Sequence, residues 1–408
     1  MGMGLSCGTL WLAAAAYAAV PPDVAELAAL TPGGPAATTH VALGRLYQLV
    51  FDRAQALQHF SAALAAAPED IEALAAYTAA TPDRALELAL FRRMLRLGVD
   101  GAAVRQRIQW LERLGDRAVN RLESPYAEYA LRMPVAYSRE SHPVGWMLEV
   151  RLNDSRPLRL LLDTGARGIL INAAANRQAR LERLAETQLD GFGDGPARTG
   201  EVLLAESMRV GGVVFSNVIV EAANVTLPAD LDGLIGLDVF RQFAITLDGK
   251  RSRLRLAPLA GSSASDGEGE RPTWRHVPAP PAQRTLLQAK HLLVAPVQLD
   301  GKRPARFALD SGAAYSLLRP PSPSVVALRQ VGLQGLSGFA SLGEAPRAVR
   351  VELPGGGRAV LHEAVYADLS ELSASFGLPL DGLLGFPALR RLVTTIDLRS
   401  GSLHVAAE

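Results

Sequence analysis

One segment of this 408-residue chain occurs twice, 147 positions apart. Residues 150–170 and 297–317 each contain an apolar run, a polar turn and a second apolar run. In both copies the second run ends in Asp, a hydroxyl residue, Gly and Ala, at positions 163–166 and 310–313. An internal repeat of this kind predicts two structurally similar halves, and each half then contributes one such Asp.

The repeat continues beyond these two segments. Gly191-Phe192 and Gly338-Phe339 lie at equal distances after the two Asp residues, and an Asp-Gly-Leu-Ile/Leu-Gly segment follows at 232–236 and at 381–385. A single Asp-hydroxyl-Gly is usually a turn. Two copies, each after an apolar strand and before the same later segments, indicate a duplicated structural unit.

The pattern after residue 133 is that of a β-rich protein. Residues 144–162 and 294–309 alternate apolar and polar positions around an Asn-Asp or Asp-Gly turn, which predicts hairpins. Each half closes with another pair of strands, near 245–256 and 395–405. We therefore expect two β-lobes at 134–258 and 284–408. The Ser-, Gly- and Pro-rich residues 259–283 form the predicted linker.

Residues 20–133 are rich in Ala and Leu at helical spacing. Part of this region resembles a tetratricopeptide repeat, with His at the usual Trp position. The matching positions are His40, Leu43, Gly44, Tyr47, Ala56, Phe60, Ala63 and Pro68. Stacked helical hairpins are one interpretation, and a generic helical bundle is the other. The predicted fold class is thus multidomain α+β, with a helical, repeat-like region before a bilobal all-β unit.

Residues 1–19 read as an export signal, with an apolar run from Leu10 to Val20 and small residues at Ala16 and Ala18. This predicts a periplasmic or secreted bacterial protein. The alternative is an uncleaved segment that anchors the chain to a membrane. Cys7 is the single cysteine, so removal of the signal would exclude disulfides and thiolate chemistry from the mature protein.

Composition limits the remaining function classes. Hydrophobic residues make up 49% of the chain and charged residues 20%, as in folded proteins. The formal net charge of +1 gives no reason to expect a nucleic-acid partner. The seven His residues show no His-Glu-x-x-His pattern, so we expect no metal and no other cofactor. Arg251, Arg253 and Arg255 alternate with Leu, a pattern that indicates an exposed strand face more often than a binding patch.

The two motif sets together resemble retropepsin-like aspartic proteases, with two halves fused as in pepsin-type enzymes. The resemblance covers about residues 134–408. It implies that Asp163 and Asp310 are catalytic and meet across a pseudo-two-fold axis. It further implies that Thr164, Gly165, Ser311 and Gly312 support this pair of Asp residues, called the dyad below. A flap that covers the substrate would include Gly191, Phe192, Gly338 and Phe339. Asp232 and Asp381 would be structural. Phe192 and Phe339 could instead be core residues, and this alternative carries most weight for Phe339.

Two carboxyl groups about 3 Å apart cannot both ionise and therefore share one proton. The predicted function is an aspartic endopeptidase, in which the ionised Asp takes a proton from water and the protonated Asp binds the substrate carbonyl. The predicted partners are a polypeptide substrate and a protein bound through the helical region, and the enzyme is expected to be a monomer. A catalytically silent peptide-binding protein or a scaffold is the alternative.

Overall fold

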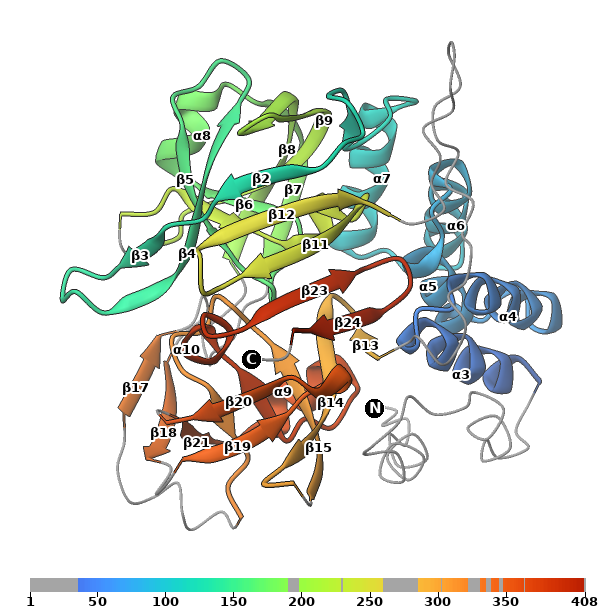
Figure 1. Cartoon of the computed structure of the whole chain (residues 1–408). Coiled ribbons are helices and arrows are strands. Elements are labelled where there is room, and N and C mark those ends of the chain that lie inside the picture. Colours follow the sequence, from blue (N-terminus) through green and yellow to red (C-terminus); the bar gives the residue numbers. More distant parts are fainter. Residues whose placement is uncertain are drawn as a thin grey trace.

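The computed structural model describes residues 36–189, 198–228, 230–259, 285–301, 303–321, 331–334, 339–344, 348–362 and 364–406. The expected export signal and nearly all of the predicted linker lie outside these ranges. None of the described helices is long and apolar enough to cross a membrane. Helices occupy the N-terminal part and strands dominate the rest, so the predicted fold class is confirmed (Figure 1).

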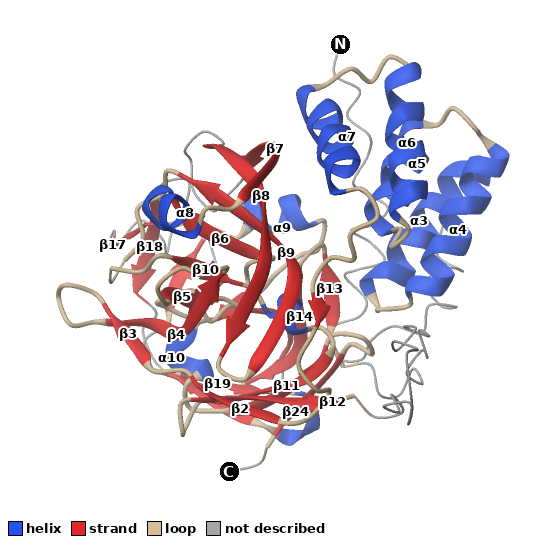
Figure 2. Cartoon of the chain, turned by 90° about the horizontal axis from the view of Figure 1, so that it is seen from above, coloured by secondary structure: helices blue, strands red, loops and turns tan. Residues whose placement is uncertain are grey.

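From residue 36, where the described residues begin, five consecutive helices precede the first strand, and they pack beside one another as hairpins (Figure 2). Their bounds are α3 Ala36–Leu49, α4 Arg53–Ala66, α5 Ile71–Ala80, α6 Arg84–Arg96 and α7 Ala102–Leu114. The side chains of Asp52, Asp70 and Asp83 accept amide hydrogen bonds at the starts of α4, α5 and α6, which satisfies donors that a helix leaves free. The ring of Phe60 packs directly on Gly44, where an added Cβ would lie 2.4 Å from the ring.

The first β-lobe is a nine-stranded sheet. Its strands are β1 Arg121–Leu122, β3 Val135–Tyr137, β4 Pro143–Leu152, β5 Leu158–Leu162, β6 Ile169–Asn172, β7 Glu182–Leu189, β8 Arg198–Val210, β9 Val213–Ala223 and β10 Gly233–Ile235. Helix α8 (Ala173–Ala179) and the short helix η1 (Leu237–Phe240) complete the lobe. Strand β10 lies between β5 and β6, parallel to β5 and antiparallel to β6.

The second β-lobe is a ten-stranded sheet. Its strands are β13 Leu287–Ala289, β14 Leu292–Leu299, β15 Arg303–Leu309, β16 Leu317–Leu318, β17 Val331–Gln334, β18 Phe339–Glu344, β19 Val349–Glu352, β20 Arg358–Leu361, β21 Val365–Ala367 and β22 Gly382–Leu384. Its helices are α9 Ser370–Phe376 and α10 Phe386–Leu389. Strand β22 lies parallel to β15 and antiparallel to β16, which repeats the arrangement of β10, β5 and β6.

A third, five-stranded sheet joins the two lobes in the order β2-β12-β11-β23-β24. Its strands are β2 Tyr129–Arg132, β11 Phe243–Asp248, β12 Arg253–Pro258, β23 Val393–Asp397 and β24 Ser402–Val405. At its centre Thr246 faces Thr395, and their hydroxyl oxygens are 2.8 Å apart. The two threonines occupy equivalent positions of the repeat, so a pseudo-two-fold axis passes between β11 and β23.

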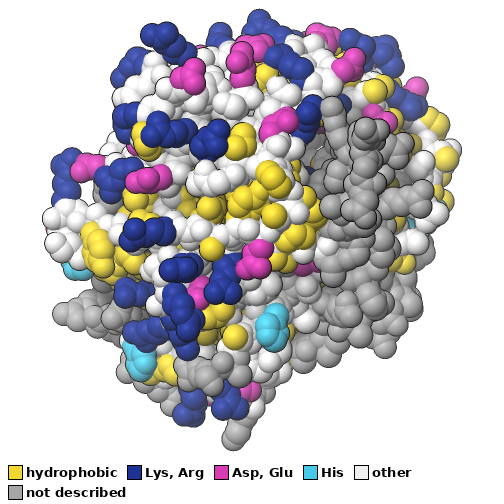
Figure 3. Space-filling model, turned by 45° about the horizontal axis from the view of Figure 1, so that its top comes forward, with side chains coloured by type: hydrophobic (Ala, Val, Ile, Leu, Met, Phe, Trp, Pro, Cys, Tyr) yellow, Lys and Arg dark blue, Asp and Glu magenta, His cyan; other side chains and the backbone are white. Residues whose placement is uncertain are grey.

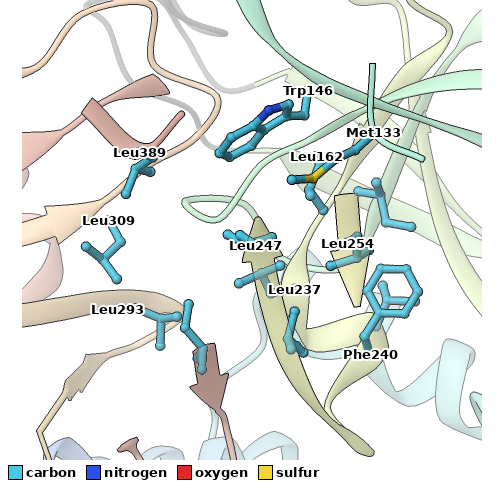
Figure 4. Packing of buried hydrophobic residues seen from close by; sticks show 14 of the residues in the cluster. Met133, Trp146, Leu162, Leu237, Phe240, Leu247, Leu254, Leu293, Leu309 and Leu389 are labelled. Carbon is cyan, nitrogen blue, oxygen red and sulfur yellow. The ribbon is translucent and has the colours of Figure 1, made fainter. Parts of the chain in front are cut away.

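The main core lies between this joining sheet and the two lobe sheets. Alternate residues of β11 and β12 point inward, among them Leu247 and Leu254, which belong to the same buried cluster as Leu162 and Leu309 (Figure 4). Leu162 and Leu309 are the last residues of β5 and β15. A buried apolar layer therefore supports the two strand ends from which Asp163 and Asp310 emerge.

The helical region packs against both lobes. Leu114 of α7 joins a buried cluster with Leu184 of β7 and Leu204 of β8. Phe51, in the turn between α3 and α4, packs on Gly401 between β23 and β24. Strands β1 and β2 already lie within residues 20–133. They pair with β9 and β12, more than eighty residues away, so local periodicity could not reveal them.

Candidate active site

Asp163 and Asp310 stand at equivalent strand ends in the two lobes. Asp163 follows β5, and its amide donates to the carbonyl of Ile235 in β10 at 2.9 Å. Asp310 follows β15, and its amide donates to the carbonyl of Leu384 in β22 at 3.0 Å. The later Asp-Gly-Leu-Ile/Leu-Gly segments therefore supply the strands that hold each Asp loop in place.

The glycines of the two loops lie against the opposite carboxyl groups. A Cβ built on Gly165 would be 2.9 Å from Cγ of Asp310, and one built on Gly312 would be 2.6 Å from Cγ of Asp163. Any side chain at either position would collide with the opposite Asp, so only glycine permits this approach. The structure thus brings together the four predicted residues from the two halves.

Thr164 and Ser311 link the loops through a reciprocal set of hydrogen bonds. The Thr164 hydroxyl donates to the carbonyl of Leu309 (2.8 Å) and accepts from the Ser311 amide (2.9 Å). The Ser311 hydroxyl donates to the carbonyl of Leu162 (2.6 Å) and accepts from the Thr164 amide (3.0 Å). Both side chains are buried. Four buried bonds across the lobe interface fix the separation of the two carboxyl groups.

The two carboxyl groups lie close enough to influence each other's ionisation, and both have raised pKa values. Burial raises the pKa of Asp163, and amide hydrogen bonds from Gly165, Ala166 and Gly312, together with the side chain of Asp310, oppose this rise. Burial and then the negative charge of Asp163 hold the pKa of Asp310 well above its usual range. The pair therefore favours one shared proton, and its titration belongs to the two carboxyl groups together.

Asp232 and Asp381 each accept a hydrogen bond from a backbone amide of their own lobe. Asp232 accepts from the amide of Arg159 at 2.9 Å, and Asp381 accepts from the amide of Arg306 at 3.0 Å. Arg159 and Arg306 lie in the strands that lead to the two dyad loops. Both carboxylates are thus bound within the framework, away from the dyad.

Sequence reasoning missed His291, which lies in the turn between β13 and β14. Its ring lies beside the backbone of Gly165 in the opposite lobe and meets the Phe376 ring edge-on, with centroids 5.2 Å apart. Burial and the positive charge of Arg167 lower the pKa of His291, so the ring is neutral near neutral pH. A lone His in a turn gives no sequence signal, because its partner lies more than a hundred residues away.

The helical region also reaches the surroundings of the first dyad loop. At the end of this loop the Gly168 amide donates to Oδ1 of Asp238 at 2.8 Å. Burial raises the pKa of nearby Glu221, and the charges of Arg167 and of Arg107 in α7 oppose that rise. A residue of the helical region therefore contributes to the electrostatic field beside the loop that carries Asp163.

Most of the predicted flap cannot be placed. Gly191, Phe192 and Gly338 lie outside the described residues, and for Phe339 the structure gives only the backbone, at the start of β18 opposite Gln334. Strands β7 and β8 pair as far as Leu189 and Arg198, on either side of the first predicted flap. Within the described part of the chain, no three His, Cys, Asp or Glu side chains come close enough together to hold a metal ion.

Residues 148–239 match the sequence model of a family described as aspartyl protease, so the resemblance read from the motifs is confirmed. An aspartic proteinase from Irpex lacteus is 12% identical over 68% of this chain and 97% of its own, with a TM-score of 0.42. A retropepsin-like aspartic protease from Rickettsia conorii is 18% identical over 34% of this chain and 98% of its own, with a TM-score of 0.24. No curated protein matches the sequence.

Proposed function

We propose that this chain is an aspartic endopeptidase whose catalytic groups are Asp163 and Asp310. The observation that carries the proposal is the reciprocal packing of each loop glycine on the opposite carboxyl group. Two adjacent buried carboxyl groups with raised pKa values form a unit that keeps one proton. A peptide-binding protein has no need of such a pair, because extended chains are held by backbone hydrogen bonds and side-chain pockets.

The two Asp residues would play different roles when substrate binds. The ionised Asp163 accepts a proton from a water molecule, which then attacks the scissile carbonyl carbon. The protonated Asp310 donates a hydrogen bond to the carbonyl oxygen as that oxygen gains negative charge. Proton transfer to the leaving nitrogen then breaks the C–N bond and returns the pair to its starting state. No covalent intermediate forms.

The supporting groups keep this geometry fixed during the reaction. The hydroxyls of Thr164 and Ser311 lock the loops together, and His291 lies beside the Gly165 backbone of the opposite lobe. Such preorganisation lowers the cost of stabilising developing charge in the transition state. For localisation, we propose export to the bacterial periplasm on the basis of the N-terminal apolar segment. Cell fractionation with and without residues 1–19 tests that proposal.

The test of the catalytic proposal is hydrolysis of denatured protein by the wild type beside Asp163→Asn and Asp310→Asn. Each substitution removes half of the shared-proton pair, so we expect each to lower kcat/KM by about 10² to 10⁴-fold or more. The double variant should lose no more than either single variant, because the two residues act as one unit. A statine-type inhibitor, whose hydroxyl replaces the attacking water, should block the wild type.

Circular dichroism and thermal unfolding of the Asn variants provide the folding control. Near-wild-type turnover by either folded variant would overturn the assignment. Absence of hydrolysis by the wild type, together with saturable binding of unfolded peptides by all variants, would support the peptide-binding alternative.

A further inference from the structure

The outer face of the joining sheet carries a concentration of positive charge. Alternate residues of its strands point outward, and these include Arg132 of β2 and both Arg253 and Arg255 of β12, all exposed. Lys250 and Arg251 extend the same charge into the exposed turn between β11 and β12. We call these five residues the basic face. The chain as a whole has a formal charge of only +1, so this charge is a local feature.

Of the basic face, Arg251 is ion-paired with Asp248, whereas the three strand arginines form no described ion pair. Within the described part of the chain, no carboxylate oxygen lies within ion-pair distance of Arg132, Arg253 or Arg255. On the outward positions of the five strands the acidic residues are Asp248 and Asp397. Asp248 is buried and pairs with Arg251 at 3.2 Å, and Asp397 accepts hydrogen bonds from Ser400. The guanidinium groups of the strands are therefore available to an external anion.

Two of these arginines face each other across neighbouring strands. Arg253 of β12 lies directly opposite Arg132 of β2 on one side and Asp248 of β11 on the other, and like charges at directly opposed positions destabilise a sheet. Charged side chains on an edge strand can prevent sheets from pairing edge to edge. That role does not account for Arg253 and Arg255, because β12 is an internal strand with β2 on one side and β11 on the other.

The outer face also points away from the dyad. The opposite face of the sheet buries Leu247 and Leu254 in the core that supports the ends of β5 and β15. On the side of the molecule seen in Figure 3, Lys and Arg side chains gather beside a band of hydrophobic side chains. The outward strand positions beside the basic face include Ala130, Ala244 and Ala257. Small apolar groups next to cations on one open surface suit the headgroup region of a bilayer.

We propose that the basic face docks the protein on an anionic lipid bilayer, with the dyad directed away from the membrane. Each Lys or Arg at an anionic surface strengthens binding roughly fivefold, so the three strand arginines together give substantial adsorption without insertion. A bilayer is favoured over a compact anionic ligand because the cations lie across a sheet rather than converging on one point.

The test is sedimentation of the full chain with vesicles of phosphatidylcholine, with or without phosphatidylglycerol. Binding to the neutral vesicles measures the contribution of the N-terminal apolar segment, which is the same in every variant. The basic-face variant is R132Q/R253Q/R255Q. The matched control, R96Q/R177Q/R303Q, removes three exposed arginines elsewhere, on α6, α8 and β15. We expect the basic-face variant to lose about a hundredfold in affinity for anionic vesicles and the control to lose little.

A salt titration of the wild type makes the test independent of variant folding. Added salt shortens the screening length to below about 10 Å above roughly 0.1 M, so binding to anionic vesicles should fall steeply and binding to neutral vesicles should not. Equal binding by the basic-face and control variants would overturn the proposal, and so would salt-insensitive binding. Retention on immobilised heparin without any binding to anionic vesicles would also overturn it, since the partner would then be a soluble polyanion. None of these outcomes bears on hydrolysis.

Discussion

The two β-lobes share their backbone design and differ in how side chains reinforce it. In both lobes the strand before the dyad loop pairs with a later parallel strand, and an Asp of that later segment accepts an amide of the first. In the first lobe Arg156 also pairs with Asp232 at 2.8 Å. The equivalent Arg303 and Asp381 form no described ion pair. The comparison shows that a duplicated unit retains its backbone hydrogen bonds while peripheral side-chain contacts diverge.

The lobes also differ in their contact with the helical region. Helix α7 packs along β7 of the first lobe, where Leu114 meets Leu184, and Arg117 pairs with Glu182 at 2.6 Å. The second lobe receives Val50, which joins the cluster containing Leu287 and Leu292. Strands β7 and β8 flank the first predicted flap, so the helical region supports the base of that hairpin.

The first and largest expected effect tests this difference. Leu114→Ala should lower the free energy of unfolding by about 2 to 5 kcal/mol, because it leaves a cavity between α7 and β7. Val50→Ala removes fewer atoms and should cost less. Thermal and denaturant unfolding measure both effects, and amide hydrogen exchange in β7 locates the first. Loss of protection should be confined to α7, β7 and β8 in Leu114→Ala. Equal loss of amide protection in both lobes would contradict the inference that the helical region contacts each lobe independently.

The second prediction concerns the contact in which the lobes are most alike. Thr164→Ala removes the hydrogen-bond partner of the Leu309 carbonyl and of the Ser311 amide in a buried site. Ser311→Ala likewise removes the partner of the Leu162 carbonyl and of the Thr164 amide. Each change should cost roughly 2 to 4 kcal/mol of stability. Thr164→Ser and Ser311→Thr keep the hydroxyl and serve as controls with small effects. Denaturant unfolding distinguishes the two pairs of variants. If only one of the two Ala variants lost stability, the hydrogen bonds between the loops would not be reciprocal.

The third prediction separates the two carboxyl groups by pH. Because the pKa of Asp310 is raised in the folded protein, its contribution to stability is fully present below the unfolded value of about 3.9. It is lost as the pH rises through the folded pKa. Asp310→Asn removes this dependence, so its Tm should rise above that of the wild type as the pH increases towards neutral. Asp163→Asn should show a smaller rise. Identical pH profiles for wild type and both variants would exclude a proton shared within a buried pair.

The features of this molecule that could be predicted from the sequence are those that depend on its repeated local motifs. The duplicated segments around Asp163 and Asp310 predicted two similar halves, and the structure places the paired loops together across a pseudo-two-fold axis. The predicted structural roles of Asp232 and Asp381 agree with their hydrogen bonds to backbone amides. Each of these features depends on residue types at a fixed spacing, which a single sequence displays.

Features that depend on distant pairing were not predictable. His291 meets Gly165 only after the lobes associate, and nothing near residue 291 marks it. Strand β2 is four residues long and gains its stability from β12, so its own pattern is too weak to identify. The alternation of Arg253 and Arg255 did predict an exposed strand face. The opposition of Arg253 to Arg132 became visible only in the sheet register.

The smallest expected effect returns to the side-chain contact that distinguishes the lobes. Arg156 is half exposed, whereas Asp232 is largely buried and also accepts the Arg159 amide. Arg156→Gln should therefore lower the free energy of unfolding by only about 0.2 to 1 kcal/mol, because solvent screens an exposed guanidinium. The matched Arg303→Gln should have almost no effect. Denaturant titrations in low and high salt measure both, and the cost of Arg156→Gln should shrink as salt rises. An equal cost for the two variants would show that Arg303 contributes an interaction of similar strength, and the divergence of the lobes would then be limited to their contacts with the helical region.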